Sequence, residues 1–283
     1  MAARRSFDVD KRPDRPTSDR RAVLWGLGGV AAGSLFRSSS QAKAGLNEIH
    51  VMISGGFHAA YQTLGPEFEH VSGLTLATVL GPSMGSAPTA IPIRLSRGEP
   101  ADVIILAREA LDQLVRDGRV VAGSETDLVR SRIGMAVRAG AMAPDISTPD
   151  RLRTVLLQAR SIAYSDSASG VYVANELFNR LGIEDQVVSK AHKITATPVG
   201  EAIADGDADV GFQQLSELLP ISGIQVVGPI PDAVQKVTIF SAGVSSTSTA
   251  PMAARRLIAF LASQQAWPAI RKTGLEPAAA FAK

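Results

Sequence analysis

Short apolar runs and amphipathic segments alternate along the chain from residue 48 onward. Runs such as 48–54 (EIHVMIS) and 101–107 (ADVIILA) are almost continuously apolar, which is typical of strands buried on both faces. The segment 57–73 instead has apolar residues near the helical period, namely Phe57, Ala60, Tyr61, Leu64 and Phe68. This alternation predicts an α/β fold in which helices flank mixed, mostly parallel sheets.

The same pattern continues to the end of the chain. It predicts further strands over 74–81, 132–140, 161–165, 208–213, 223–230 and 236–246. It predicts further helices over 90–98, 108–120, 148–160, 171–182, 197–207, 214–220 and, in two pieces, 250–275.

These elements are too many for one sheet in a chain of 283 residues, so we expect two α/β lobes. No Gly/Ser-rich linker occurs, which favours strands that cross directly between the lobes. The strands at 132–140 and 237–244 are the candidates for these crossings. We therefore assign residues 1–44 to an export signal. The first lobe consists of 45–130 and 239–283, and the second lobe, between these two parts, is 131–238.

The first 44 residues have the features of an export signal. The pair Arg20-Arg21 precedes a weakly apolar run over 22–36, and the small-residue pattern AKA follows at 42–44. The paired arginines favour twin-arginine export, and an ordinary secretory signal is the alternative. We expect cleavage near Ala44 and a soluble periplasmic product, because no later apolar run is long enough to span a membrane.

Charge and composition exclude several classes of function. The formal net charge is +2, but residues 1–44 carry nine Lys or Arg against four Asp or Glu. The rest of the chain is therefore net acidic, so we expect no binding of nucleic acid. No cysteine is present, which excludes disulfides and thiolate chemistry. The four histidines lack metal-ligand spacing, and no P-loop motif occurs, so we expect neither a metal nor a cofactor.

Small and hydroxylated residues occupy four predicted junctions between a strand and the next helix. They are 54–56 (SGG), 81–86 (GPSMGS), 165–170 (SDSASG) and 197–200 (TPVG). Ligands of α/β sheets bind at the carboxyl ends of strands, where helix starts offer unpaired backbone N–H groups and partial positive charge. Together the junctions indicate a pocket for a small anion. Taken singly, each junction is explained better by helix capping alone.

Three stretches carry a family resemblance, at 49–73, 80–107 and 164–182. The most specific piece is RLSRGEPADVII, Arg94–Ile105. Over nearly all of 48–275 the chain resembles the molybdate-binding, extracytoplasmic substrate-binding proteins of ABC importers. The resemblance implies a two-lobed type II periplasmic binding protein fold. It also implies that hydroxyl and backbone N–H donors hold an oxyanion in the cleft between the lobes.

Carried over position by position, the resemblance implies a set of ligand-binding residues. These residues are Ser54, Gly55, Gly56, Ser83, Met84, Gly85, Ser86, Ser169, Gly170, Val199 and Gln214. Gly56 stands where the family has a serine, and Gln214 stands where it has a tyrosine. These two departures leave the ligand open between a tetrahedral oxyanion and a carboxylate.

The signatures GPSMG…AIPIRL and SDSASGVY are similar to a branch of this family that includes aconitate isomerase. A tricarboxylate would need a cation, for which Arg94 is the candidate, and a solvated helix arginine is the alternative. Moving a double bond would also need a general base. The junctions offer three candidates for this base: Asp166, His58 and Glu201. The alternative roles are a helix cap for Asp166, a helix-surface histidine for His58 and a first-turn acid for Glu201.

The sequence therefore predicts an extracytoplasmic protein that captures a small anion, such as molybdate or a carboxylate, for an ABC importer. Its partners would be that anion and a membrane permease, and we expect a monomer. The alternative is an enzyme like aconitate isomerase, which moves a double bond in a tricarboxylate on the same fold.

Overall fold

The computed structural model describes residues 47–195 and 197–281. The expected export signal at 1–44, with its cleavage site near Ala44, lies outside the described residues. Within the described part of the chain, no helix is both long and apolar enough to cross a membrane.

The strands of the described residues form one connected sheet. Their bounds are β1 (Glu48–Ile53), β2 (Thr75–Leu80), β3 (Val103–Ala107), β4 (Thr126–Arg138), β5 (Ile162–Ser165), β6 (Ala191–Ile194), β7 (Val210–Gln214), β8 (Ile224–Pro229), β9 (Val237–Val244) and β10 (Glu276–Pro277). The order is β2-β1-β3-β9-β4-β7-β5-β6, and β8 and β10 also pair with β4. The α/β class predicted from the sequence is confirmed.

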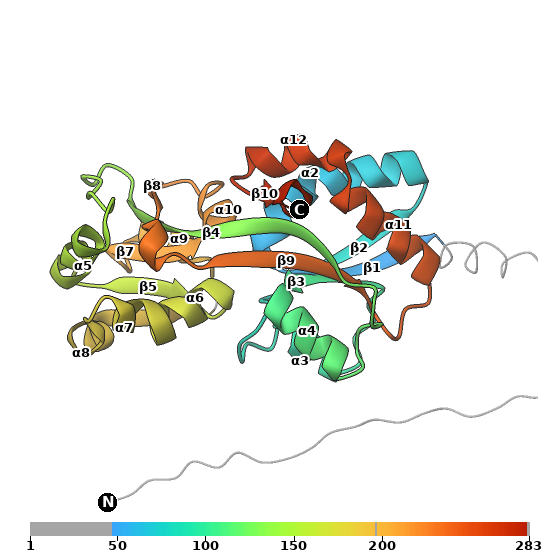
Figure 1. Ribbon diagram of the computed structural model, residues 1–283, viewed down its shortest axis with the longest axis horizontal. Helices are drawn as coiled ribbons and strands as arrows, with labels where there is room; N and C mark the ends of the chain where they lie inside the picture. Colours follow the sequence, from blue (N-terminus) through green and yellow to red (C-terminus); the bar gives the residue numbers. More distant parts are fainter. Residues whose placement is uncertain (1–46, 196, 282–283) are drawn as a thin grey trace, which may run out of the picture. The chain divides into compact units, whose positions relative to one another are not determined.

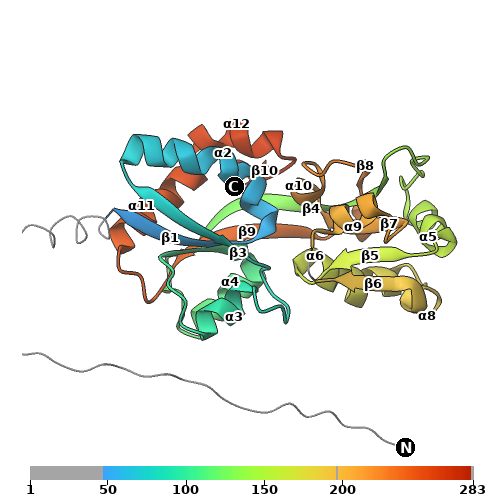
Figure 2. The same ribbon diagram turned by 180° about the vertical axis from the view of Figure 1, so that it is seen from behind.

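Helices lie on both sides of this sheet (Figure 1; Figure 2, from behind). They are α2 (Gly55–Ser72), α3 (Ile91–Ser96), α4 (Arg108–Arg116), α5 (Pro149–Gln158), α6 (Ala168–Tyr172), α7 (Phe178–Arg180), α8 (Glu184–Val187), α9 (Val199–Asp205), α10 (Leu215–Leu218), α11 (Pro251–Ala262) and α12 (Trp267–Lys272). Short 3-10 or π segments are η1 (Val173–Leu177), η2 (Val188–Lys190), η3 (Asp232–Val234), η4 (Gln264–Ala266) and η5 (Ala278–Phe281).

Strand β4 belongs to two halves of the sheet. Its residues 126–132 pair with β9, and its residues 133–137 pair with β7. We call β1, β2, β3, β9 and β10 the terminal half, and β5, β6, β7 and β8 the middle half. The pairs β1–β2, β1–β3, β5–β6 and β5–β7 are parallel, whereas every pairing of β4 and β9 is antiparallel. The sheet is therefore mixed, and its antiparallel centre is flanked by parallel strands.

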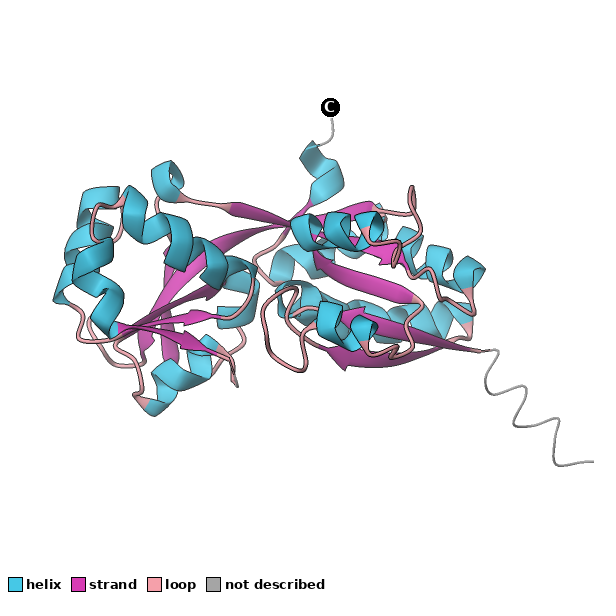
Figure 3. Ribbon diagram, turned by 90° about the horizontal axis from the view of Figure 1, so that it is seen from below, coloured by secondary structure: helices cyan, strands magenta, loops and turns pink. Residues whose placement is uncertain are grey.

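Each half has its own apolar core. In the terminal half, Ile49, Val51 and Ile53 pack with α2, α11 and α12. The neighbouring Met52 points to the other face, where it packs with α3 and α4, as the two-residue period of a strand requires. In the middle half, Ile162 packs with α5 and the α6–η1 helix, whereas Ala163 packs with α9. Figure 3 shows the two groups of helices, with strands running between them.

Most predicted elements occur where the sequence indicates. The short elements α8 and β10 are not predicted, and three other elements differ. The strand expected from residue 132 is longer and begins at Thr126. The helix expected from residue 171 begins at Ala168 and contains a π segment. Strand β6 was not predicted, because its four residues AHKI are partly exposed and form the edge of the middle half. The lobe boundaries stay a prediction.

A buried carboxylate, Asp102, holds together three segments of the terminal half. Asp102, 2% exposed, accepts hydrogen bonds from the Ser248 hydroxyl (2.6 Å) and from the backbone N–H groups of Thr249, Ala250 and His50 (3.0, 3.2 and 2.8 Å). Burial alone would raise the pKa of Asp102, but these hydrogen bonds outweigh it, so the pKa lies below its usual value. The carboxylate thereby ties the start of α11 to β1 and β3.

Replacing this carboxylate tests its role in stability. We expect Asp102→Asn to lower the free energy of unfolding at pH 7 by about 3 kcal/mol, because an amide N–H then faces backbone donors. Since the folded-state pKa is lowered, the wild-type advantage is complete above about pH 4 and is lost as the pH falls through the folded-state pKa. Urea unfolding at several pH values measures this difference. The exposed Asp205→Asn is the control, and a loss as small as the control's would contradict the assignment.

Candidate functional site

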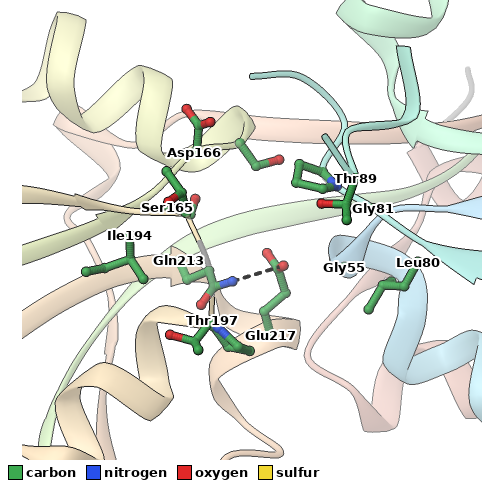
Figure 4. Close-up of a pocket in the computed structure, with 14 residues that line it drawn as sticks. Gly55, Leu80, Gly81, Thr89, Ser165, Asp166, Ile194, Thr197, Gln213 and Glu217 are labelled. Carbon is green, nitrogen blue, oxygen red and sulfur yellow. Dashed lines mark hydrogen bonds between the residues drawn. The ribbon is translucent and has the colours of Figure 1, made fainter. Parts of the chain in front are cut away.

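A pocket of 230 Å³ opens where strands from both halves end (Figure 4). Its walls come from the residues that follow β1, β2, β5, β6 and β7, at the carboxyl end of each strand. The lining residues are Gly55, Leu80, Gly81, Pro82, Thr89, Ser165, Asp166, Ser167, Ile194, Thr195, Thr197, Pro198, Gln213 and Glu217. All four junctions singled out in the sequence therefore contribute to one pocket.

Gly55 is one of the two predicted site residues in this lining. It opens α2, a helix of 18 residues whose first backbone N–H groups have no partner within the helix. A Cβ at Gly55 would lie 2.1 Å from Oε1 of Glu217, so only glycine admits that carboxyl group at its observed position. The helix start and the Glu217 carboxyl group are thus in close contact.

Asp166 is the other predicted residue in the lining, and its carboxylate already has two partners. Oδ1 lies 2.9 Å from Nζ of Lys193 on β6, and Oδ2 accepts a hydrogen bond from the backbone N–H of Ser86 at 3.2 Å. Gly85 lies directly against the same carboxylate. The Asp166 side chain therefore connects the loop after β2, in the terminal half, to the middle half.

Several of the small residues at the junctions serve packing. A Cβ at Gly56 would meet the Phe240 ring at 2.1 Å, and one at Gly170 would meet the Ser165 carbonyl oxygen at 1.6 Å. The Ser83 hydroxyl accepts a hydrogen bond from the Ala107 backbone N–H at 3.0 Å. These glycines and this serine hold strands and helices together outside the pocket lining.

Two further serines are buried next to the pocket. The hydroxyls of Ser169 and Ser165 lie 3.1 Å apart. The Ser54 hydroxyl is buried and has no partner among the described residues. Only Ser165 of these three belongs to the lining.

The remaining predicted ligand-binding groups have other partners. The backbone N–H of Val199 donates to Oε1 of Gln213 at 3.0 Å. The buried Gln214 amide donates to the Thr238 hydroxyl at 3.0 Å, while its oxygen has no partner among the described residues. Met84 lines a separate cavity with Lys236.

The predicted cation and the other two predicted bases also lie outside the lining. Arg94 donates to the Thr89 carbonyl oxygen (3.1 Å) and to the Glu99 carboxylate (2.7 Å), so it supports the pocket edge from behind. His58 is half-buried on α2, where burial lowers its pKa. Glu201 is exposed in the first turn of α9.

Glu217, on α10, is the pocket residue that sequence reasoning missed. Burial raises the pKa of Glu217 to about 7, although hydrogen bonds from the Gln213 amide and the Gln214 backbone N–H lower it. The Gln213 amide nitrogen lies 3.0 Å from its Oε1 (Figure 4). The sequence pattern predicts only a helical turn over 214–220. Its position directly after a buried strand makes it a fifth junction, and that signal would have found Glu217.

The pocket offers donors and carboxyl groups in place of fixed positive charge. Its described lining residues include no Arg or Lys, and Lys193 approaches it only through Asp166. The described residues also contain no group of three or more His, Asp or Glu side chains that could hold a metal ion. Such a lining offers hydroxyls and helix starts as hydrogen-bond donors, and Glu217 as a group that can take or give a proton.

Comparison with known proteins identifies the family. The sequence profile of the family described as "Bacterial extracellular solute-binding protein" matches residues 49–276. The chain belongs to this family. It is also 45% identical over 250 residues to a protein named aconitate isomerase from Pseudomonas sp., with 88% of this chain and 95% of that protein covered.

Solved structures of solute-binding proteins share the fold. The periplasmic molybdate-binding protein of Azotobacter vinelandii aligns with a TM-score of 0.66 at 17% identity, covering 80% of this chain and 98% of that one. The sulfate-binding protein SubI of Mycobacterium tuberculosis H37Rv aligns with a TM-score of 0.64 at 19% identity, covering 82% and 87%. The predicted type II periplasmic binding protein fold is confirmed for this solute-binding protein.

The raised pKa of Glu217 predicts an unusual dependence of stability on pH. The folded protein keeps the Glu217 proton up to about pH 7, whereas an unfolded chain releases it near pH 4.3, about the ordinary value. Wild-type stability should therefore fall as the pH rises between these two values. The Glu217→Gln side chain has no proton to lose. We therefore expect the difference in free energy of unfolding between Glu217→Gln and wild type to rise by up to about 3 kcal/mol from pH 4 to pH 8, in favour of the variant.

Urea unfolding of both proteins at pH 4 and pH 8 measures this gain. Glu67→Gln, which alters an exposed carboxyl group on α2, is the matched control and should follow wild type at both values. If Glu217→Gln also follows wild type, the carboxyl group ionises as an ordinary glutamate and its assignment fails.

Proposed function

We propose that this solute-binding protein is an isomerase that moves a double bond within an unsaturated tricarboxylate such as aconitate. The observation that carries the proposal is a pocket carboxyl group, Glu217, whose pKa of about 7 suits both taking and returning a proton at neutral pH. The 45% identity to a protein named aconitate isomerase supports the same substrate class.

The reaction needs one proton and no other reactant. The Glu217 carboxylate removes a proton from the CH₂ group next to the central double bond. The electron pair of that C–H bond forms the new double bond, and the old double bond takes the proton back from Glu217 at its other carbon. The substrate is neither oxidised nor reduced, and the carboxylate is regenerated.

The substrate carboxylates would be held by the groups that surround Glu217. The start of α2 at Gly55 offers backbone N–H groups, and the hydroxyls of Ser165 and Thr197 lie in the same lining. Lys193, which pairs with Asp166 of the lining, would offset part of the substrate charge. Arg94 is engaged by Glu99 and would act only by supporting the loop at Thr89.

Capture of an anion for an ABC importer is the second candidate. It is favoured by the family and by the helix starts that line the pocket. In that case the ligand is bound without turnover, and a membrane permease is the partner. Both candidates share the proposed export by the leader at 1–44 to the periplasm, and a monomeric state.

Turnover separates the two candidates. Incubation of residues 45–283 with trans-aconitate in D₂O should yield cis-aconitate, with deuterium in the former CH₂ or CH position, as followed by ¹H NMR. We expect Glu217→Gln to lower kcat by about 10²- to 10⁴-fold with little change in KM, because it removes the base and keeps the shape. Glu67→Gln, on the exposed face of α2, is the control.

Absence of both isomer formation and deuterium exchange would overturn the isomerase proposal. A thermal-shift series with aconitate, citrate, molybdate and sulfate then tests capture. A ligand at 100 times its Kd should stabilise the folded protein by about 2.7 kcal/mol. No shift with any of these anions would overturn capture of these ligands as well.

A further inference from the structure

Gln213 links Glu217 to the start of another helix. It is the penultimate residue of β7, is 6% exposed and lies in the pocket wall. Its Oε1 accepts a hydrogen bond from the backbone N–H of Val199 at 3.0 Å, and its Nε2 donates to Oε1 of Glu217 at 3.0 Å. The side chain thus spans from α9 to α10, and Figure 4 shows its hydrogen bond to Glu217.

The chemistry of these partners fixes which end of the Gln213 amide faces Glu217. A backbone N–H only donates, so the atom that faces Val199 must be the amide oxygen. The NH₂ group is then left for Glu217, and because NH₂ also only donates, the Glu217 oxygen that it meets must accept. In a protonated carboxyl group the carbonyl oxygen is the stronger acceptor, so this hydrogen bond favours the Glu217 proton on Oε2.

We propose that Gln213 is a positioning residue that keeps Oε1 of Glu217 as a hydrogen-bond acceptor and reserves Oε2 for the proton. The catalytic consequence rests on the proposed function, since Oε2 is then the atom that exchanges a proton with the substrate. The placement of the proton itself does not rest on turnover. Val199 takes part through its backbone N–H, which is linked to the Glu217 carboxyl group by two successive hydrogen bonds through Gln213.

Few other groups compete with Gln213 for control of Glu217. On α2, the backbone at Gly55 touches Oε1, and at the end of β7 the backbone N–H of Gln214 contributes a hydrogen bond. Across the pocket, the charged groups are Asp166 and its partner Lys193. Among the described residues Glu217 forms no ion pair, so the Gln213 amide is the side-chain donor that stabilises its charged form.

Removal of the Gln213 donor should shift the titration of Glu217. In protein labelled with ¹³C at the glutamate carboxyl groups, the Glu217 signal is identified by its absence from Glu217→Gln. We expect a midpoint near pH 7 in wild type. In Gln213→Leu the midpoint should move up by about one pH unit, because the charged form loses a hydrogen bond. The midpoint of the pH–rate profile should move in parallel. We expect the fold decrease in kcat to be about ten times the fold change in KM.

Gln214→Leu is the matched control, since it removes a buried amide at the next position of the same strand without touching the Glu217 side chain. It should leave the midpoint in place. If Gln213→Leu does not fold, Gln213→Glu serves instead: it keeps an oxygen for Val199, and a second carboxyl group beside Glu217 should raise the midpoint by more than one unit. An unchanged midpoint in the folded variant, or an equal shift in Gln214→Leu, overturns the proposal. A shifted midpoint without any turnover would support the positioning role and refute the isomerase.

Discussion

Strand β4 is hydrogen-bonded to both halves of the sheet, and the location of the pocket follows from that sharing. β3 is antiparallel to β9, which is antiparallel to β4, so β1, β2 and β3 run in the direction of β4, toward the middle half. β7 is antiparallel to β4 and parallel to β5, so β5, β6 and β7 run the opposite way. The carboxyl ends of the two sets therefore face each other. Helix starts from both halves then meet at one place without any long connecting loop.

The sequence predicts the parts of this arrangement that depend on periodicity. Buried runs such as 101–107 and the small residues at four junctions are visible in one dimension, and both were found. Strand β6 was missed because a short edge strand with exposed His192 and Lys193 lacks an apolar pattern. Glu217 was missed because a glutamate in a helical turn looks the same whether water or a pocket surrounds it. Its altered proton affinity arises from burial, and burial is known only after folding.

The small residues at the site determine how helices pack against strands, and the carboxyl groups lie in the pocket wall. Gly56 and Gly170 leave no room for a side chain, because helices start there against Phe240 and Ser165. They set how closely each helix approaches its strand, and so they fix where backbone N–H groups point. Glu217 is the carboxyl group that enters the space so created, and burial there raises its pKa.

The contact between Asp166 and the backbone N–H of Ser86 has a consequence for affinity. That N–H belongs to the loop of the terminal half that borders the pocket, and a carboxylate of the protein already occupies it. An arriving anion that uses the same donor must displace Asp166, which then keeps only Lys193. Asp166 would in this sense compete with any anion that uses the Ser86 N–H.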